Sequence, residues 1–486
     1  MQRGEISPEL RCARPPAMSA GSPAKARKVT MTLVDATAGT GHRFGVCSLA
    51  STSAAAWGGG SQLLSAGRDG TICAWKYSAD AAAAVAPELS FVLEDHTDWV
   101  NDLVLVHEGG QAAALVSCSS DTTLKVWRPS GQAGQPAECH TMRRHTDYVK
   151  ALAYAPQARL LASASCDRTV LLWDLHTLQP CGGSSAAGDV NSHRDSVYCL
   201  ATNPTASLLA SGSVDNDVRL WDPRSAEGHF TLRGHTDAVR GLAMSEDGTR
   251  LISCGSDRTV RIWHLGERRC EQVFTPHEDS VFCLAVDPAW TSVLSGGRDG
   301  TVCMTPLRGG AAPHSTLLCK GRGIVQRLLS PPEHPELLWV ASSESMLNCW
   351  ALPPAAQVTA AAARPVTPRR RTAPAPPSSP GATPPAATPP CTPSAVAVGM
   401  CSPGSGPGSG GSGVGGGGGK GPEAVPLLSS PQLTISGAAG VHQYAVMPSK
   451  LQVLTEDTAG NAAVWDIWRG EIASRHTKKA RALKGP

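Results

Sequence analysis

The side chains with the clearest chemical potential are a histidine, a serine and an aspartate that recur together at fixed spacing. As His235, Ser253 and Asp257, they match a hydrolytic triad, in which histidine activates serine and aspartate orients histidine. The set occurs five more times, as His42, Ser65, Asp69; His96, Ser117, Asp121; His145, Ser163, Asp167; His193, Ser211, Asp215; and His277, Ser295, Asp299. A catalytic triad is needed once, and no G-x-S-x-G elbow accompanies these sets. We therefore predict no catalytic residue and no enzymatic activity.

A tryptophan ten residues after the serine completes most of these sets. It is present as Trp75, Trp127, Trp173, Trp221 and Trp263, and Thr305 replaces it in the last set. Successive aspartates of the sets lie 42 to 52 residues apart, with short apolar runs and turn residues between them. A repeat of this length and signature is typical of a WD-repeat β-propeller, in which four-stranded blades stack around an axis. We expect each quartet to be buried and internally hydrogen-bonded, because unpaired buried polar groups are costly.

The predicted fold is therefore all-β, a propeller of eight blades with a long disordered insertion before the last blade. The insertion is rich in Pro, Ala, Thr and Gly, a composition that cannot bury a core. The expected organisation is a disordered N-terminal segment (1–28), blades one to seven (29–352), the insertion (353–431), a last blade (432–475) and a basic tail (476–486).

The last two predicted blades depart from the quartet pattern. The seventh ends in Trp350 but carries Glu344 where the aspartate is expected. The eighth restores part of the pattern with His442, Asp457 and Trp465. An apolar strand at 29–34 precedes the first repeat, and we expect it to close the last blade.

Composition excludes several classes of function. The formal net charge of +3 indicates neither a nucleic-acid surface nor an acidic tail. The 16 cysteines form no C-x-x-C pair, so we predict no metal site and no cofactor, and interpret them as small buried side chains in a reducing compartment. No apolar run approaches the length of a membrane span. We expect a protein partner, with no membrane and no specific nucleic acid.

Strand periodicity brings aromatic and basic residues to one rim of the propeller. Positions three and five after the histidine, and one before the aspartate, face the same end of the ring. They carry aromatic and basic side chains, which are common anchors of protein interfaces. The predicted partner-binding residues are Trp99, Tyr148, Lys150, Tyr198, Arg240, Phe282 and Arg298. Arg219, in the fourth blade, is expected on an outward-facing strand away from this rim.

Several long stretches resemble one family of propellers. HTDWVNDLVL (96–105), SSDTTLKVW (119–127), HTDYVKALAYA (145–155), VRLWDPR (218–224) and SGGRDG (295–300) look like the WD repeat-containing protein 48 family. Residues 454–467 are also similar to that family's last repeat. The resemblance covers roughly residues 29–352 and 440–472.

The resemblance implies a non-catalytic regulatory subunit. Members of that family dock on the catalytic domain of a ubiquitin-specific protease and activate it allosterically. Their contacts with the protease fall near the positions of Arg240, Phe282 and Arg298 here. The resemblance implies a location in the nucleus and cytoplasm, and a second WD-repeat protein is a further candidate partner. Family members carry a SUMO-like domain after the propeller, and this sequence ends at Pro486 without one, which leaves substrate delivery open.

A different adaptor function remains as the alternative. WD-repeat propellers also serve as substrate receptors of cullin–RING ubiquitin ligases or as scaffolds in chromatin complexes, and fold alone does not separate these functions. A ligase receptor is expected to carry paired W-D-x-R motifs. WDPR at 221–224 fits that motif once.

Overall fold

The structure is a computed structural model that describes 13 stretches and one single residue of the chain. They are residues 41–53, 57, 59–78, 86–108, 111–129, 138–181, 193–223, 230–307, 315–353, 426–438, 441–447, 452–457, 460–466 and 471–476. This part contains 32 β-strands in eight four-stranded antiparallel sheets. In every sheet the strands lie side by side in chain order, which is the arrangement of a propeller blade.

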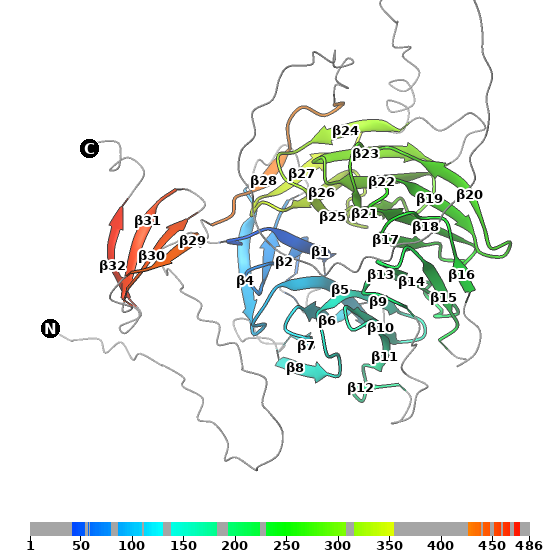
Figure 1. The fold of residues 1–486 in the computed structure, drawn as a ribbon, viewed down its shortest axis with the longest axis horizontal. Helices are drawn as coiled ribbons and strands as arrows, with labels where there is room; N and C mark the ends of the chain where they lie inside the picture. Colours follow the sequence, from blue (N-terminus) through cyan, green and yellow to red (C-terminus); the bar gives the residue numbers. More distant parts are fainter. Residues whose placement is uncertain are drawn as a thin grey trace, which may run out of the picture. The chain divides into compact units, whose positions relative to one another are not determined.

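Seven of the sheets are blades of one ring, with the first strand of each nearest the axis (Figure 1). The first four blades are β1 (Val46–Thr52), β2 (Gln62–Gly67), β3 (Thr71–Lys76), β4 (Glu88–Glu94); β5 (Val100–Glu108), β6 (Gln111–Ser119), β7 (Thr123–Arg128), β8 (Glu138–Arg143); β9 (Val149–Ala155), β10 (Leu160–Ser165), β11 (Val170–Asp174), β12 (Gln179–Pro180); and β13 (Val197–Thr202), β14 (Leu209–Ser213), β15 (Val218–Trp221), β16 (Phe230–Leu232).

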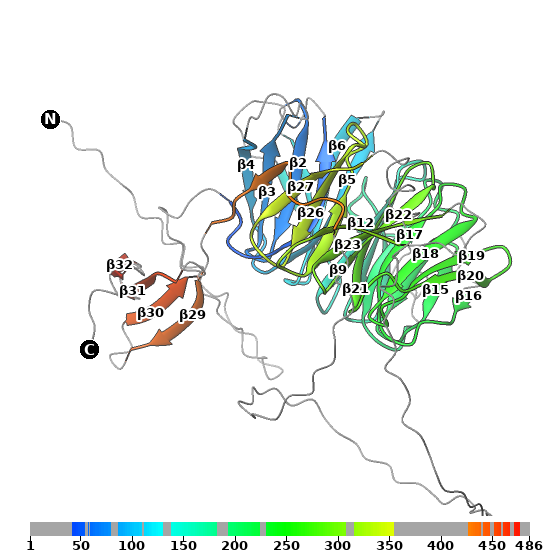
Figure 2. The same ribbon diagram turned by 90° about the horizontal axis from the view of Figure 1, so that it is seen from above.

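Blades five to seven complete the ring, which Figure 2 shows turned by 90° from the view of Figure 1. Their strands are β17 (Val239–Met244), β18 (Arg250–Gly255), β19 (Val260–His264), β20 (Arg269–Phe274); β21 (Val281–Val286), β22 (Ser292–Gly297), β23 (Thr301–Pro306), β24 (Thr316–Lys320); and β25 (Val325–Leu329), β26 (Leu337–Ser342), β27 (Leu347–Ala351), β28 (Leu433–Ile435).

The ring closes after seven blades, not the eight that the sequence predicts. Strand β25 of blade seven packs directly against β1 of blade one. A shared core joins the two blades, with Val46 and Trp75 packed with Trp339 and Leu347. Because blade one packs between blades seven and two, and blade seven between blades six and one, the ring has no place for another blade. The propeller is confirmed, and the count of eight is wrong.

The strands expected to form the eighth blade make a separate sheet. It consists of β29 (Val441–Val446), β30 (Gln452–Asp457), β31 (Ala462–Asp466) and β32 (Glu471–His476). It keeps one feature of a WD blade, since the Trp465 indole N–H donates to Thr455 Oγ1 at 2.8 Å. Asp457 instead accepts from the Asn461 side chain at 2.9 Å. Its fourth strand, β32, follows directly in the chain; strand 29–34, expected to close the blade, lies outside the described residues.

Blade seven takes its outer strand from beyond the long insertion. Residues of β28 pair with β27, with Ile435 opposite Leu347. Just before β28, the Leu428 N–H donates to the Leu318 carbonyl of blade six at 2.8 Å. Just after it, the Ala438 N–H donates to the His42 carbonyl of blade one at 2.8 Å. Residues 426–438, which we call the clasp segment, therefore connect three blades across the point where the ring closes.

The inner strands show why the repeat folds this way. In all seven blades the valine that opens the inner strand is buried, as Val46, Val100, Val149, Val197, Val239, Val281 and Val325.

The residue after each quartet aspartate takes a left-handed conformation, with φ between 67° and 79°, at Gly70, Thr122, Arg168, Asn216, Arg258 and Gly300. This tight turn directs the aspartate back toward the histidine of its own blade. The two glycines adopt it without the steric cost that the other residues bear.

Deletion of residues 374–419 tests whether the insertion contributes to folding. We expect the melting temperature to stay near that of the full chain, since shortening a loop changes closure cost by only about 0.6 kcal/mol per halving. A longer deletion, 374–438, also removes the clasp segment and should lower the melting temperature clearly. Equal melting temperatures for the two deletions would contradict the role of the clasp segment.

Candidate functional site

The recurring quartets form closed hydrogen-bond chains inside the blades. In blade five, His235 Nδ1 lies 2.8 Å from Asp257 Oδ2, and His235 Nε2 lies 2.7 Å from Ser253 Oγ. The Trp263 indole N–H donates to the same serine oxygen at 2.8 Å. Ser253 is fully buried. Its hydroxyl is thus occupied by two partners and shielded from solvent, which suits a structural role and not nucleophilic attack.

The same geometry is present in five blades, and blade six departs from it. The histidine-to-serine distances are 2.7 to 2.9 Å throughout. In blade six Thr305 replaces the tryptophan, and its hydroxyl pairs with Ser315 at 2.7 Å instead of with Ser295. The Ser295 hydroxyl is paired with His277 at 2.9 Å, so this quartet has one link fewer.

The quartet aspartates are held in their charged form. Burial by itself would raise the pKa of Asp257, but hydrogen bonds from His235 and Thr259 bring that pKa below its ordinary value. The same balance lowers the pKa of Asp299 to about 2, with His277 and Thr301 as donors. The pKa values of Asp69, Asp121, Asp167 and Asp215 are shifted in the same direction. The six carboxylates therefore stabilise the folded state only while ionised.

Acidification should consequently unfold the ring. The folded-state pKa values lie below the unfolded value of about 3.9, so the stabilisation is present above pH 4 and is lost as pH falls toward 2. We expect the melting temperature to be level between pH 5 and 7 and to drop steeply below pH 4. Thermal unfolding followed by circular dichroism measures this. Asp299→Asn should melt lower at pH 7 and show a shallower drop, and an unchanged acid slope would contradict the assignment.

Seven half-buried side chains surround the axis of the ring at one end. Each follows the buried valine that opens an inner strand, and they are Cys47, Asn101, Lys150, Tyr198, Arg240, Phe282 and Gln326. We call this set the mouth. It combines two aromatic rings with two cations, and it includes four of the seven predicted partner-binding residues.

Arg240 lies between two aromatic rings of neighbouring blades. Its guanidinium carbon is 4.7 Å from the Tyr198 ring centroid and 5.3 Å from that of Phe282. Its Nε–H also donates to Ser256 Oγ at 3.0 Å. Cation–π contacts of this kind fix a guanidinium without neutralising its charge. The structure therefore brings Tyr198, Arg240 and Phe282 together into one preassembled cluster.

Arg298 joins this cluster through the backbone of the rim. Ser280 Oγ donates to the Ser256 carbonyl at 3.3 Å, and the Arg298 N–H donates to the Ser280 carbonyl at 2.8 Å. Ser256 in turn bonds Arg240. The Arg298 side chain is exposed and lies 3.9 Å from Asp279, so part of its charge is balanced within the chain.

The other predicted residues lie farther round the same rim. Trp99 is 43% exposed and lies under the Arg68 guanidinium, 4.7 Å from its ring centroid. Tyr148 is 47% exposed, with Lys150 Nζ 5.4 Å from its ring. Arg68 is a functional candidate that the sequence places on the rim without selecting it. The Trp99 and Tyr148 rings are exposed and available to a partner. The Arg240 side chain is less accessible, because it is half-buried at the mouth.

Sequence reasoning missed a buried acid beside the mouth. Asp102 is 5% exposed and accepts from Ser48 Oγ at 2.8 Å and from the Leu152 N–H at 3.0 Å. Arg327 of blade seven lies 3.4 Å from it. Asp102 thus connects blades one, two, three and seven around the axis. The signal available in the sequence is a lone aspartate inside an otherwise apolar strand, VNDLVLV.

Arg219 is not on an outward-facing surface, contrary to the prediction. It is 7% exposed, and its Nη2 lies 3.5 Å from Oδ2 of Asp215, the quartet aspartate of blade four. Strand β15 pairs with β14 on one edge and with β16 on the other. The Arg219 side chain lies toward the quartet of its own blade. Arg219 therefore supports the blade from within and is not a surface residue.

The repeats of the ring match a known protein-family model. Six segments match the WD domain, G-beta repeat, at residues 35–76, 87–128, 137–174, 187–222, 228–264 and 268–304. Each match ends within one residue of the position of the quartet tryptophan. This chain is a WD-repeat protein. Blade seven and the sheet β29–β32 lie outside the matched segments, as expected for sheets without a full quartet.

Within the described residues, no group of three or more His, Cys, Asp or Glu side chains is placed to hold a metal ion. In the same part of the chain, no helix is long and apolar enough to cross a membrane. The rim around the mouth combines exposed rings with cations held over aromatic rings. WD-repeat propellers typically act as scaffolds for protein interactions.

Proposed function

We propose that this WD-repeat protein is a non-catalytic regulatory subunit that binds the catalytic domain of a ubiquitin-specific protease and activates it allosterically. The observation that carries the proposal is the cluster of Tyr198, Arg240 and Phe282, with Arg298 beside it. The resemblance to the WD repeat-containing protein 48 family implies protease contacts near three of these residues. A location in the nucleus and cytoplasm belongs to the same proposal.

The chemistry of the cluster suits a docking surface. Phe282 presents an aromatic ring at the mouth, where the core does not require it, and is half-buried. Arg240 is held between two rings, so it loses little freedom when it bonds a partner. A guanidinium can make forked hydrogen bonds to carboxylates or carbonyls of the protease. Binding at this rim leaves the protease thiol untouched, so activation acts through the conformation of the protease.

A protease assay tests the proposal directly. Purified full-length protein is added to a panel of ubiquitin-specific protease catalytic domains with a fluorogenic ubiquitin substrate. We expect a saturable increase in kcat for at least one protease, and no cleavage by the propeller alone. Absence of stimulation across the panel, together with co-purification with a cullin–RING ligase adaptor, would favour the substrate-receptor alternative. In the W-D-x-R motif at 221–224 that supports this alternative, residue 224 lies outside the described residues.

A further inference from the structure

Blade seven keeps the tryptophan of the quartet and lacks the three other members. Strand pairing sets the correspondence, because Val325 lies opposite Ser342 as Val281 lies opposite Gly297 in blade six. Counting from these pairs, Gly321 stands at the histidine position, Val340 at the serine position and Glu344 at the aspartate position. Because Gly321 has no side chain, blade seven has no imidazole ring at the place where the other six blades hold one.

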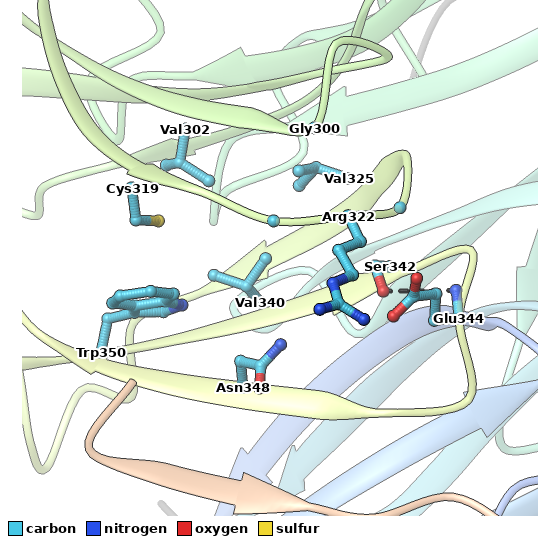
Figure 3. Close-up of a pocket in the computed structure, with 12 residues that line it drawn as sticks. Gly300, Val302, Cys319, Arg322, Val325, Val340, Ser342, Glu344, Asn348 and Trp350 are labelled. Atoms are coloured by element: carbon cyan, nitrogen blue, oxygen red, sulfur yellow. Dashed lines mark hydrogen bonds between the residues drawn. The ribbon is translucent and has the colours of Figure 1, made fainter. Parts of the chain in front are cut away.

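A cavity lies at this place (Figure 3). Gly321, Val340, Glu344 and Trp350 all line it, and its walls come from both blade six and blade seven. The cavity has a volume of about 30 Å³. Roughly 10–15 Å³ by this measure holds one water, so the cavity has room for a small group in place of water. Gly321 is exposed, and the cavity opens to solvent beside it.

One polar group at the cavity, the Glu344 carboxylate, stands where an aspartate holds histidine in the other blades. Glu344 supplies a carboxylate where Asp257 accepts from His235 in blade five. Trp350 is buried, and Val340 stands where Ser253 accepts from the Trp263 indole N–H in blade five. Figure 3 shows Arg322 and Asn348 beside the same space, near Glu344. Val302, Val325 and Val340 provide apolar contacts.

We propose that the blade-seven cavity is a binding site for an imidazole ring, supplied by a free small molecule or by a histidine side chain of a bound peptide. The ring N–H donates to Glu344, and the ring packs between the valines and the edge of Trp350. The second ring nitrogen accepts from the Asn348 amide or the Arg322 guanidinium. The ligand thus completes blade seven from outside, in the way that an internal histidine completes the other six.

Titration of the full-length protein with 4-methylimidazole tests the site. We expect saturable binding by saturation-transfer NMR and a rise in melting temperature, with no such rise for cyclopentanol at equal concentration. Glu344→Gln should weaken binding about tenfold, since a hydrogen bond to a charged acceptor is replaced by a neutral one. Absence of saturable binding to the wild type would mean that the cavity holds only water, and would overturn the proposal.

Gly321→His provides a second, independent readout. A Cβ at Gly321 meets only the Gly300 carbonyl, at an ordinary 3.7 Å, so the new side chain can enter the cavity. We expect this variant to melt higher than wild type and to bind no 4-methylimidazole. Gly266→His adds a histidine at an exposed turn of blade five and should bind like wild type. If Gly321→His still binds the ligand like wild type, the ligand occupies another place.

The source of the ring is decided by a pair of ligands. Acetyl-histidine-amide is compared with free 4-methylimidazole, with acetyl-alanine-amide as the blank. Binding of both imidazole compounds supports a site that accepts a histidine side chain, whereas binding of 4-methylimidazole alone supports a small-molecule site. Near-ultraviolet circular dichroism checks that each variant is folded. Binding of acetyl-alanine-amide as tight as that of acetyl-histidine-amide would contradict recognition of the ring.

Discussion

Combining Arg240→Glu with Phe282→Ala should abolish stimulation of the ubiquitin-specific protease. The first change reverses the charge that lies between the Tyr198 and Phe282 rings, and the second removes one of those rings. Loss of one interface anchor typically costs about 2 kcal/mol, or roughly thirtyfold in affinity, and charge reversal adds repulsion from acidic groups of the partner. Protease activity measured against propeller concentration gives both the affinity and the maximal activation.

The matched control is Arg250→Glu with Phe230→Ala. Arg250 opens strand β18 and Phe230 opens the outer strand β16, so neither belongs to the mouth. Both are exposed. This variant should stimulate the protease like wild type, and both double variants should melt close to wild type because none of the four residues belongs to a quartet. Full stimulation by the Arg240 and Phe282 variant at wild-type concentrations would place the docking surface elsewhere.

Replacing Asp257 by alanine should destabilise the ring by about 2–4 kcal/mol. Asp257 accepts from His235, from the Thr236 N–H and from both donors of Thr259. Alanine leaves these donors without an acceptor in a buried site, including the histidine that carries the link to Ser253. Urea unfolding at pH 7 measures the change in the free energy of unfolding.

Glu344→Ala is the comparison for this prediction. Glu344 occupies the equivalent position in blade seven, but its side chain has no histidine to orient. We expect a change in the free energy of unfolding within about 0.5 kcal/mol, as for other substitutions outside buried networks. Asp257→Asn, which keeps one acceptor oxygen, should fall between the two alanine variants. Equal losses for Asp257→Ala and Glu344→Ala would show that the quartets do not carry the stability of the ring.

The sequence by itself determined the repeat and the chemistry within each blade. Fixed spacing of the histidine, serine, aspartate and tryptophan predicts hydrogen bonds that the structure contains, since they form within one blade among residues fewer than 40 positions apart. The same local periodicity placed Arg240, Phe282 and Arg298 on one rim. Blade seven was identified as degenerate for the same reason, because Glu344 breaks the pattern.

Tertiary structure alone decided how many blades close the ring and what closes it. Blade number depends on the angle and packing between neighbouring sheets, which no local pattern encodes, so β25 meets β1 after seven blades. The outer strand of blade seven comes from β28, more than 80 residues after β27 along the chain, because an edge strand pairs with whichever segment the fold returns to it. The contact of Asp102 with Arg327 and the burial of Arg219 likewise depend on how blades and strands meet.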